Sequence, residues 1–295
     1  MNDKKAKGMV NGLEPKKIFM KALDPIHIGA GGYRLGRVDN TIVRDPATDV
    51  SKIPGTAIAG VVRAFYEMKE KDKDKRDKLF GTGKSKGTLR FYDAQIIFFP
   101  VSSIQGTVWV TTKEILDYWF GKLEDNNGEK ITILENNDDK AYALKGIKQN
   151  EINLGWLFVE VTDVTKGKEI KLPLEKNDFL KRIVIVSEKL FSHIVNDNLE
   201  IRTSVRIDPT TGTAAEGALF TYEAIPRGTI LGVEVVRDNT REKNDIDIDK
   251  VMGAVSSYFK LLGIGGMGTR GFGRVELLNI SNNTKDQEGS KDAES

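Results

Sequence analysis

A glycine-rich stretch near the C-terminal end, GIGGMGTRGFG (263–273), constrains the fold of this chain more than any other feature. It follows a segment with helical spacing of apolar residues, DIDKVMGAVSSYFKLL (247–262), and leads into a strand-like run, FGRVELLNI (272–280). Glycine accepts turns and close backbone approaches that side chains forbid. The chain therefore either turns tightly here or lets another group come close to its backbone.

The order helix, glycines, strand limits what that group can be. The pattern G-x-G-x-x-G (266–271) binds dinucleotides only between a strand and the N-terminus of a helix, whereas here the nearby helix end is a C-terminus, whose dipole repels anions. The sequence after the glycines also lacks the Lys-Ser/Thr of a Walker loop, and R-G-F-G (270–273) matches only the start of the RNP1 motif of RNA-recognition domains.

Two interpretations of the stretch stay open. In the structural one, Gly263 ends the helix in a left-handed cap and the other glycines allow tight packing. In the functional one, exposed backbone N–H groups contact a sugar–phosphate backbone, and Arg270 and Arg274 neutralise its phosphates.

The composition is that of a globular protein, with 39% hydrophobic and 30% charged residues over 295 positions, enough for one or two domains. The sequence contains no cysteine, which excludes disulfides, cysteine-based metal sites and thiol catalysis. Net charge is +2, and the tail at 281–295 contributes −2, so a modestly basic body can still carry one positive groove. We expect residues 1–15 to be flexible and the tail to be disordered. Without an apolar run of membrane-spanning length or a recognisable signal peptide, we expect a cytoplasmic protein.

Hydrophobic periodicity predicts a strand, a helix, several strands, a second helix and a last strand, an order that indicates an α+β fold. The predicted helices, each with its proposed N-cap, are 56–70 (Thr56) and 247–262 (Asp249). The predicted strands are 16–24, 89–101, 106–112, 155–162, 182–188, 227–236 and 272–280. The polar interval 122–154, with its turn-forming residues, is interpreted as an insertion.

Residues 201–223 form two strand-like runs joined by D-P-T-T-G (208–212), which predicts a long β-hairpin. Arg202 and Arg206 alternate on one face of its first strand. The hairpin has too few large apolar residues to be a core element along its whole length. It is either an exposed loop or a wedge that enters a nucleic acid or a neighbouring subunit.

Two polar residues near the N-terminus are candidates for chemistry. His27 lies beside a glycine-rich turn, and because the chain has only two histidines and no cysteine, a histidine-based metal site is not expected. Its interpretations are a structural residue, a nucleic-acid contact or a proton-transfer group. Asp39 lies among arginines, either as a loop carboxylate paired with one of them or as a ligand that holds a divalent cation against a phosphate.

Five short motifs resemble, in order, those of the RAMP superfamily of CRISPR–Cas proteins. They are H-I-G (27–29), I-P-G-T (53–56), G-V-V-R (60–63), L-F-G (79–81) and the C-terminal glycine loop. Within that superfamily, G-T-L-R-F-Y-D-A (87–94) and G-A-L-F-T-Y-E (217–223) look like the backbone subunit of type III-B (Cmr) effector complexes. The resemblance covers nearly the whole chain.

The resemblance implies a single domain at 16–280 with a modified RRM, or ferredoxin-like, palm, insertions at about 66–88 and 122–154, and the hairpin at 201–223 as a thumb. It implies copies of the chain that stack as a filament along CRISPR RNA, together with other Cmr subunits and away from membranes. The thumb would push between guide and target and displace a base pair, and the subunit would cleave complementary target RNA at regular intervals in a metal-dependent reaction.

The resemblance also implies the site residues. Asp39 matches the family's catalytic loop aspartate and would hold the divalent ion, Mg²⁺ or Mn²⁺. His27 matches a histidine near that site, and Glu223 is similar to an acidic residue beside the thumb. The implied RNA-binding residues are Gly29, Gly31, Gly32, Arg34, Arg37, Arg44, Thr56, Arg63, Arg202, Arg206, Gly265, Gly266, Gly268, Thr269, Arg270 and Arg274.

Three alternatives stay open at this point. The chain could be a guide-binding scaffold without catalysis, a type III-A (Csm) backbone subunit, which is usually shorter, or an endonuclease that processes CRISPR RNA. Processing enzymes commonly use metal-free acid–base chemistry. The aspartate in the matching loop and the thumb hairpin favour a target-cleaving backbone subunit instead.

Overall fold

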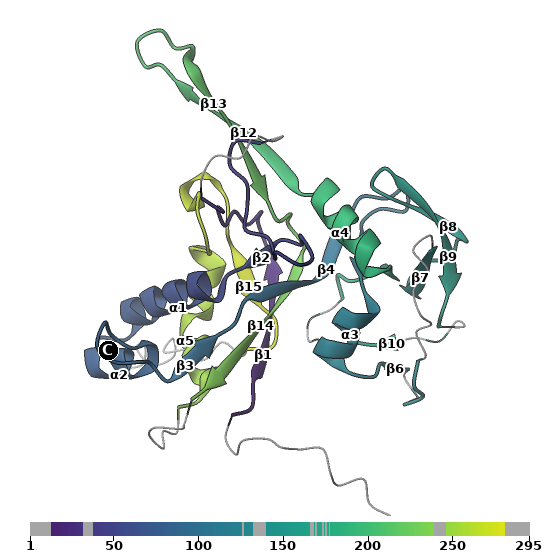
Figure 1. The fold of residues 1–295 in the computed structure, drawn as a ribbon, viewed down its shortest axis with the longest axis horizontal. Helices are drawn as coiled ribbons and strands as arrows, with labels where there is room; N and C mark the ends of the chain where they lie inside the picture. Colours follow the sequence, from purple (N-terminus) through teal and green to yellow (C-terminus); the bar gives the residue numbers. More distant parts are fainter. Residues whose placement is uncertain are drawn as a thin grey trace, which may run out of the picture.

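The computed structural model (Figure 1) combines a large mixed sheet, flanking helices and one long hairpin in an α+β fold. It describes residues 13–31, 38–125, 127–131, 140–165, 168, 170–172, 174, 176, 178–238 and 246–280. The predictions for residues 1–12, for the tail at 281–295 and for Gly32, Arg34 and Arg37 lie outside these residues.

The main sheet has 11 strands among the described residues, and its central part is antiparallel. In spatial order its path is β15 (Val275–Leu277), β1 (Lys16–Ala22), β14 (Ile230–Arg237), β4 (Ala94–Val101), β5 (Val108–Thr111), β11 (Ile183–Ile185), β7 (Lys140–Lys145), β9 (Leu157–Asp163) and β8 (Glu151–Leu154). Two short strands lie beside this path, β2 (Lys52–Ile53) on β4 and β3 (Leu89–Phe91) on β14, and a separate pair joins β6 (Glu124–Asp125) to β10 (Ile170–Lys171).

Two helices pack together on one face of this sheet. They are α1 (Gly55–Lys69) and α5 (Ile248–Leu261), with the short α2 (Lys73–Phe80) following α1. The ring of Phe65 on α1 stacks on Tyr258 and meets Phe259 edge-on, with ring centroids 5.6 and 5.3 Å apart. Ile18 and Met20 of β1 belong to the same core, because alternate strand residues point to the same face.

The opposite face of the sheet is covered as well. Phe19 of β1 packs against two rings of α3 (Lys113–Phe120), Trp119 and Phe120, and all three belong to a second core. At Gly232 of β14, a Cβ would lie only 2.7 Å from the Trp119 ring, so glycine lets α3 approach the sheet. The strands around β1 and β14 are therefore buried on both faces, so a ligand of this part of the sheet has to use its edge or its connecting loops.

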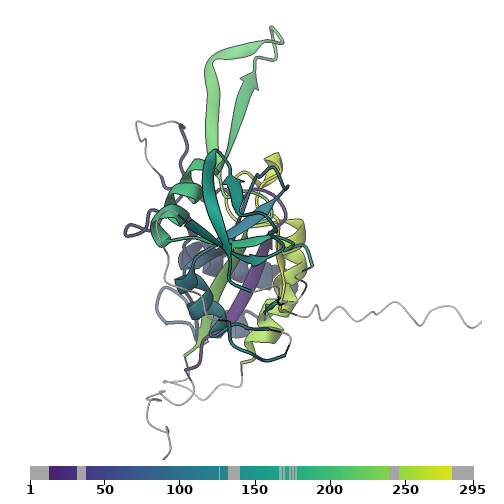
Figure 2. The same cartoon turned by 90° about the vertical axis from the view of Figure 1, so that its right-hand side faces the viewer.

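The long hairpin predicted at 201–223 is confirmed. It consists of β12 (Glu200–Ile207) and β13 (Ala214–Ala224), which follow α4 (Glu188–Asp197) and project away from the body (Figures 1 and 2). Its turn lies where the sequence predicts it, with the Gly212 N–H donating to the Asp208 carbonyl at 2.8 Å. No helix in the described part of the chain is long and apolar enough to cross a membrane.

The structure corrects several local predictions. The helix α1 begins at Gly55 without a side-chain cap, so Thr56 lies inside its first turn, and α5 is capped by Asp247, whose carboxylate accepts from Asp249 N at 2.9 Å. The interval 122–154 contributes β7 and β8 to the main sheet. Three helices, α2, α3 and α4, occur outside the two predicted helices.

Candidate nucleic-acid interface

Four segments that are far apart in the sequence meet at the base of the β12–β13 hairpin. We call this hairpin the thumb and the meeting point the junction. Isolated bridges pair Ile26 with Ile225, His27 with Gly266, Gly29 with Ile42 and Asn40 with Tyr222. The junction therefore brings together 26–30, 38–44, the end of β13 and the glycine loop 264–273. All three of the catalytic residues predicted from the sequence lie in this junction: Asp39, His27 and Glu223.

His27 is held in one orientation within the junction. Its ring is buried, with Nδ1 2.7 Å from the carbonyl oxygen of Glu223 and the ring of Tyr222 packed edge-on at 5.7 Å. Because a carbonyl can only accept a hydrogen bond, Nδ1 carries the proton. In the neutral ring Nε2 is then the proton acceptor, and it lies on the side of Gly29, where a Cβ would be 3.4 Å away.

Glu223 and Arg44 form a buried ion pair. Their side chains are 10% and 17% exposed, and the distance from Glu223 Oε1 to Arg44 Nη2 is 2.5 Å. The other carboxylate oxygen accepts from the Ile42 N–H at 3.2 Å, and Arg44 also donates to Asn196 on α4. Both side chains thus fasten segment 38–44 between the thumb and α4, so the geometry favours a structural use of the two residues.

Asp39 is exposed at the outer end of this segment. Its Oδ2 accepts hydrogen bonds from both the N–H and the hydroxyl of Thr221, at 2.8 and 2.9 Å. The Thr221 backbone N–H, and after it the hydroxyl, hold the pKa of Asp39 below its usual value. The predicted ion pair with an arginine stays a prediction, because Arg34 and Arg37 lie outside the described residues.

Some glycines of the loop fit the structural interpretation of the sequence, and others fit the functional one. Gly263 and Gly273 are buried with φ of 78° and 92°, and a Cβ on Gly273 would lie 2.3 Å from the Ile264 carbonyl oxygen. These two glycines serve packing, and Gly263 follows α5 in the predicted left-handed conformation. Gly265, by contrast, presses the loop onto the carbonyl of His27, and the residues from Gly268 to Gly271 are exposed.

The predicted RNA-binding arginines have different surroundings. Arg270 is exposed and its Nη1 lies 3.2 Å from the hydroxyl of Tyr222 in the junction. Arg202 lies over the ring of Phe272, 4.7 Å from its centroid, and Arg206 is exposed farther along the thumb. Arg274 instead forms a two-pronged pair with Asp24, at 2.5 and 3.2 Å, which lowers the pKa of Asp24.

The remaining predicted contacts lie on other parts of the surface or beside the junction. Thr56 and Arg63 lie on α1, where Arg63 is 3.9 Å from Asp77. Gly29 and Gly31 are exposed next to His27. The junction therefore collects Arg44, Arg202, Arg270 and the glycines, while Thr56 and Arg63 belong to a different element.

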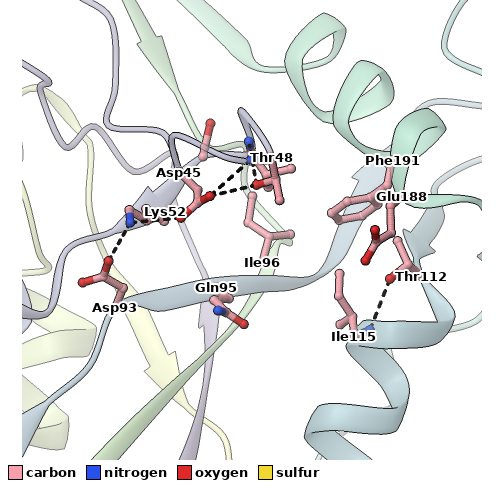
Figure 3. Close-up of a pocket in the computed structure, with 12 residues that line it drawn as sticks. Asp45, Thr48, Lys52, Asp93, Gln95, Ile96, Thr112, Ile115, Glu188 and Phe191 are labelled. Atoms are coloured by element: carbon pink, nitrogen blue, oxygen red, sulfur yellow. Dashed lines mark hydrogen bonds and ion pairs between the residues drawn. The ribbon is translucent and has the colours of Figure 1, made fainter.

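A cavity of about 250 Å³ lies beside the junction, between the loop after Arg44 and the first turns of α3 and α4 (Figure 3). On one side of the cavity the Lys52 ammonium bridges Asp45 and Asp93 at 3.2 and 2.7 Å, and Glu188 lies on the opposite side (Figure 3). Three carboxylates against one ammonium repel phosphate. The cavity is therefore not a candidate RNA site, and the junction remains the one that the geometry favours.

A metal ion would depend on the RNA as well as on the protein. Among the described residues, no group of three or more His, Asp or Glu side chains is placed to enclose one. Mg²⁺ is commonly bound by one or two carboxylates together with substrate phosphates. The single carboxylate of Asp39 fits that arrangement, in which the nucleic acid supplies the other ligands.

Comparisons with known proteins agree with the short motifs. The RAMP superfamily model matches residues 19–276. The CRISPR system Cmr endoribonuclease Cmr4 of Pyrococcus furiosus is 31% identical over 287 residues, which cover 90% of this chain and 96% of that protein.

Solved structures show the same fold. A type III-B Cmr-β complex bound to cognate target RNA contains a chain with a TM-score of 0.69 and 19% identity, covering 90% of this chain and 96% of that one. The crystal structure of an oligomeric Cmr4 from Pyrococcus furiosus matches with a TM-score of 0.63 and 23% sequence identity. This match covers 90% of this chain and 98% of that one. The chain therefore belongs to the RAMP superfamily and, within it, to the family of the Cmr endoribonucleases of CRISPR systems.

Proposed function

We propose that this chain is the backbone subunit of a type III-B effector complex, which binds guide RNA, stacks with copies of itself along the guide and cleaves complementary target RNA. The relative that shares 31% of its residues is a Cmr endoribonuclease, and structural relatives occur in a complex bound to target RNA and in an oligomer. The observation that carries the proposal is the junction, where an exposed carboxylate lies at the base of a projecting hairpin.

The palm of this subunit is a modified RRM. In support, the order β1, α1, β4, β14, α5, β15 along the chain and β15-β1-β14-β4 across the sheet is that of a β-α-β-β-α-β ferredoxin-like unit. RRM domains stack bases on an open sheet face. Because α3 covers that face here, the guide runs along the loop edge, over the exposed part of the glycine loop and Arg270.

Cleavage follows from where the thumb meets the target. The hairpin splays the guide–target duplex, and one target phosphate is turned toward Asp39. A divalent ion such as Mg²⁺ or Mn²⁺, when bound there, stabilises charge on that phosphate. The adjoining 2′-hydroxyl attacks the phosphorus and gives its proton to Nε2 of His27. The bond to the 5′-oxygen breaks, and that oxygen takes a proton from water, which leaves a 2′,3′-cyclic phosphate and a 5′-hydroxyl.

The test is Asp39→Asn in a complex reconstituted with guide RNA and the other subunits. We expect target cleavage to slow by about 100-fold or more, since a charge-stabilising group is lost, while guide binding stays unchanged. The measurement is a single-turnover cleavage time course beside a guide-binding titration.

A non-catalytic scaffold is the second candidate, and one observation favours it. Asp39 is already hydrogen-bonded to Thr221, as a purely structural aspartate would be. Normal cleavage by the Asp39→Asn complex would show that Asp39 is a structural residue and would contradict our proposal that it is catalytic.

A further inference from the structure

Thr221 lies within the motif G-A-L-F-T-Y-E (217–223) but was not among the predicted site residues, and it hydrogen-bonds the proposed catalytic carboxylate directly. Its N–H and hydroxyl both reach Oδ2 of Asp39, and its hydroxyl oxygen also lies 2.9 Å from the Asp39 N–H. Its carbonyl accepts from the N–H of Asn40 at 3.0 Å. Every polar group of Thr221 is therefore directed at residues 39–40.

These bonds fix the direction of a side chain that would otherwise rotate freely. An exposed aspartate in a loop samples several rotamers, whereas two hydrogen bonds to one carboxylate oxygen select a single one. The threonine itself has a stiff χ1 because it is β-branched. Both bonds from Thr221 go to Oδ2, so we expect Oδ1 to be the oxygen that faces a ligand such as RNA or a metal ion.

We propose that Thr221 is a positioning residue for target cleavage, which holds Asp39 so that Oδ1 faces the bound strand. This inference rests on the proposed function, because it takes Asp39 to be the catalytic carboxylate. It also links the thumb to the reaction, since Thr221 directly follows Phe220, an exposed apolar residue of the hairpin. A thumb displaced from the duplex would carry Thr221, and with it Asp39, out of place.

Orientation rather than charge is what Thr221 supplies at neutral pH. An aspartate with an ordinary pKa of about 3.9 is already ionised at pH 6–8, and Thr221 lowers the Asp39 pKa further. Loss of the hydroxyl therefore leaves the carboxylate charged and removes one of the two hydrogen bonds that fix its direction, while the bond from the backbone N–H remains. The ratio of variant to wild-type rates should be the same at pH 6 and at pH 8.

The experiment compares three variants in the reconstituted complex. Thr221→Val keeps the shape and removes the hydroxyl, Thr221→Ser restores the hydroxyl, and Thr203→Val makes the same change on the neighbouring strand, where Thr203 is the cross-strand partner of Thr221. The measurements are the single-turnover cleavage rate, the affinity for target RNA and the spacing of the products.

We expect Thr221→Val to slow cleavage about 10- to 100-fold, as for other residues that orient a metal-binding group, with affinity and product spacing unchanged. Thr221→Ser and Thr203→Val should cleave within about threefold of wild type. Normal cleavage by Thr221→Val, with Asp39→Asn inactive, overturns the inference and leaves the proposed function intact. Normal cleavage by both overturns the proposed function itself. A loss of target affinity, altered spacing or failure of Thr221→Ser would make Thr221 a structural part of the thumb and also overturn the inference.

Discussion

At the scale of single residues, a side chain's partner decided its use more than its identity did. Arg44 and Glu223 are residue types that suit phosphate binding and acid–base catalysis, yet they are buried against each other. Arg270 and Arg274 are both exposed, yet Arg274 pairs with the carboxylate of Asp24, whereas Arg270 donates to the hydroxyl of Tyr222. Nothing in the local sequence distinguishes these arginines.

The Arg44–Glu223 pair should therefore contribute to stability. Arg44→Ala leaves a buried carboxylate without its partner, which costs about 3 kcal/mol and lowers the melting temperature by roughly 6–12 °C. Arg63→Ala is the matched control, because its ion pair is long and exposed and is worth less than about 1 kcal/mol. The measurement is thermal unfolding of the isolated chain. An unchanged melting temperature with weakened guide binding would return Arg44 to the RNA-binding set.

At the scale of secondary-structure elements, the two long helices and many of the strands follow from the sequence, whereas β7, β8 and three shorter helices do not. The eight residues of α3, KEILDYWF, are rich in aromatic and β-branched types that favour strands. They form a helix because Thr112 caps its N-terminus, accepting from Ile115 N at 3.2 Å, and because Leu116 and Trp119 are buried in the second core. Tertiary packing thus overrode a weak local preference.

The thumb is the element whose surface most needs a partner. Its apolar side chains include Leu219 and Phe220, 63% and 40% exposed, and an isolated two-stranded hairpin is only marginally stable. Replacing both by Ser should leave the melting temperature nearly unchanged, since exposed substitutions usually change stability by less than about 0.5 kcal/mol. Target cleavage should be lost.

The control for this thumb variant is Trp156→Ser, because Trp156 is an even more exposed apolar residue on the turn between β8 and β9. It should retain target cleavage. The measurements are melting curves of the isolated chain and cleavage by the reconstituted complex. A fully active thumb variant would show that the hairpin is an ordinary surface loop.

At the scale of the whole molecule, the strands around β1 and β14 are covered on both faces, so we expect RNA to bind along the loop edge through a few cations. Arg270→Ala should reduce the slope of log affinity against log salt by about 1, because one phosphate contact is lost. Arg274→Ala should leave the slope unchanged and lower stability instead, since its charge is matched by Asp24. Guide-binding titrations between low and moderate salt, beside melting curves, separate the two. Equal slopes for Arg270→Ala and wild type would place the guide elsewhere.

The sequence by itself determined the features that depend on residues close together in the chain, such as helices, strands, turns and short motifs. Apolar spacing indicated most elements, the turn at 208–212 predicted the hairpin, and the order helix, glycines, strand argued against dinucleotide binding. Short motifs identified the superfamily, which the match over residues 19–276 confirmed.

Only the tertiary structure decided which of the candidate side chains form ion pairs or hydrogen bonds with other residues of the chain. Glu223 and Arg44 are 179 positions apart, Arg274 and Asp24 are 250 apart, and Thr221 reaches Asp39 across 182. Such contacts depend on the path of the whole chain, and no local pattern of residues encodes them. The physical reason is that hydrogen bonds and ion pairs act over a few ångströms, while a sequence fixes distances only between near neighbours.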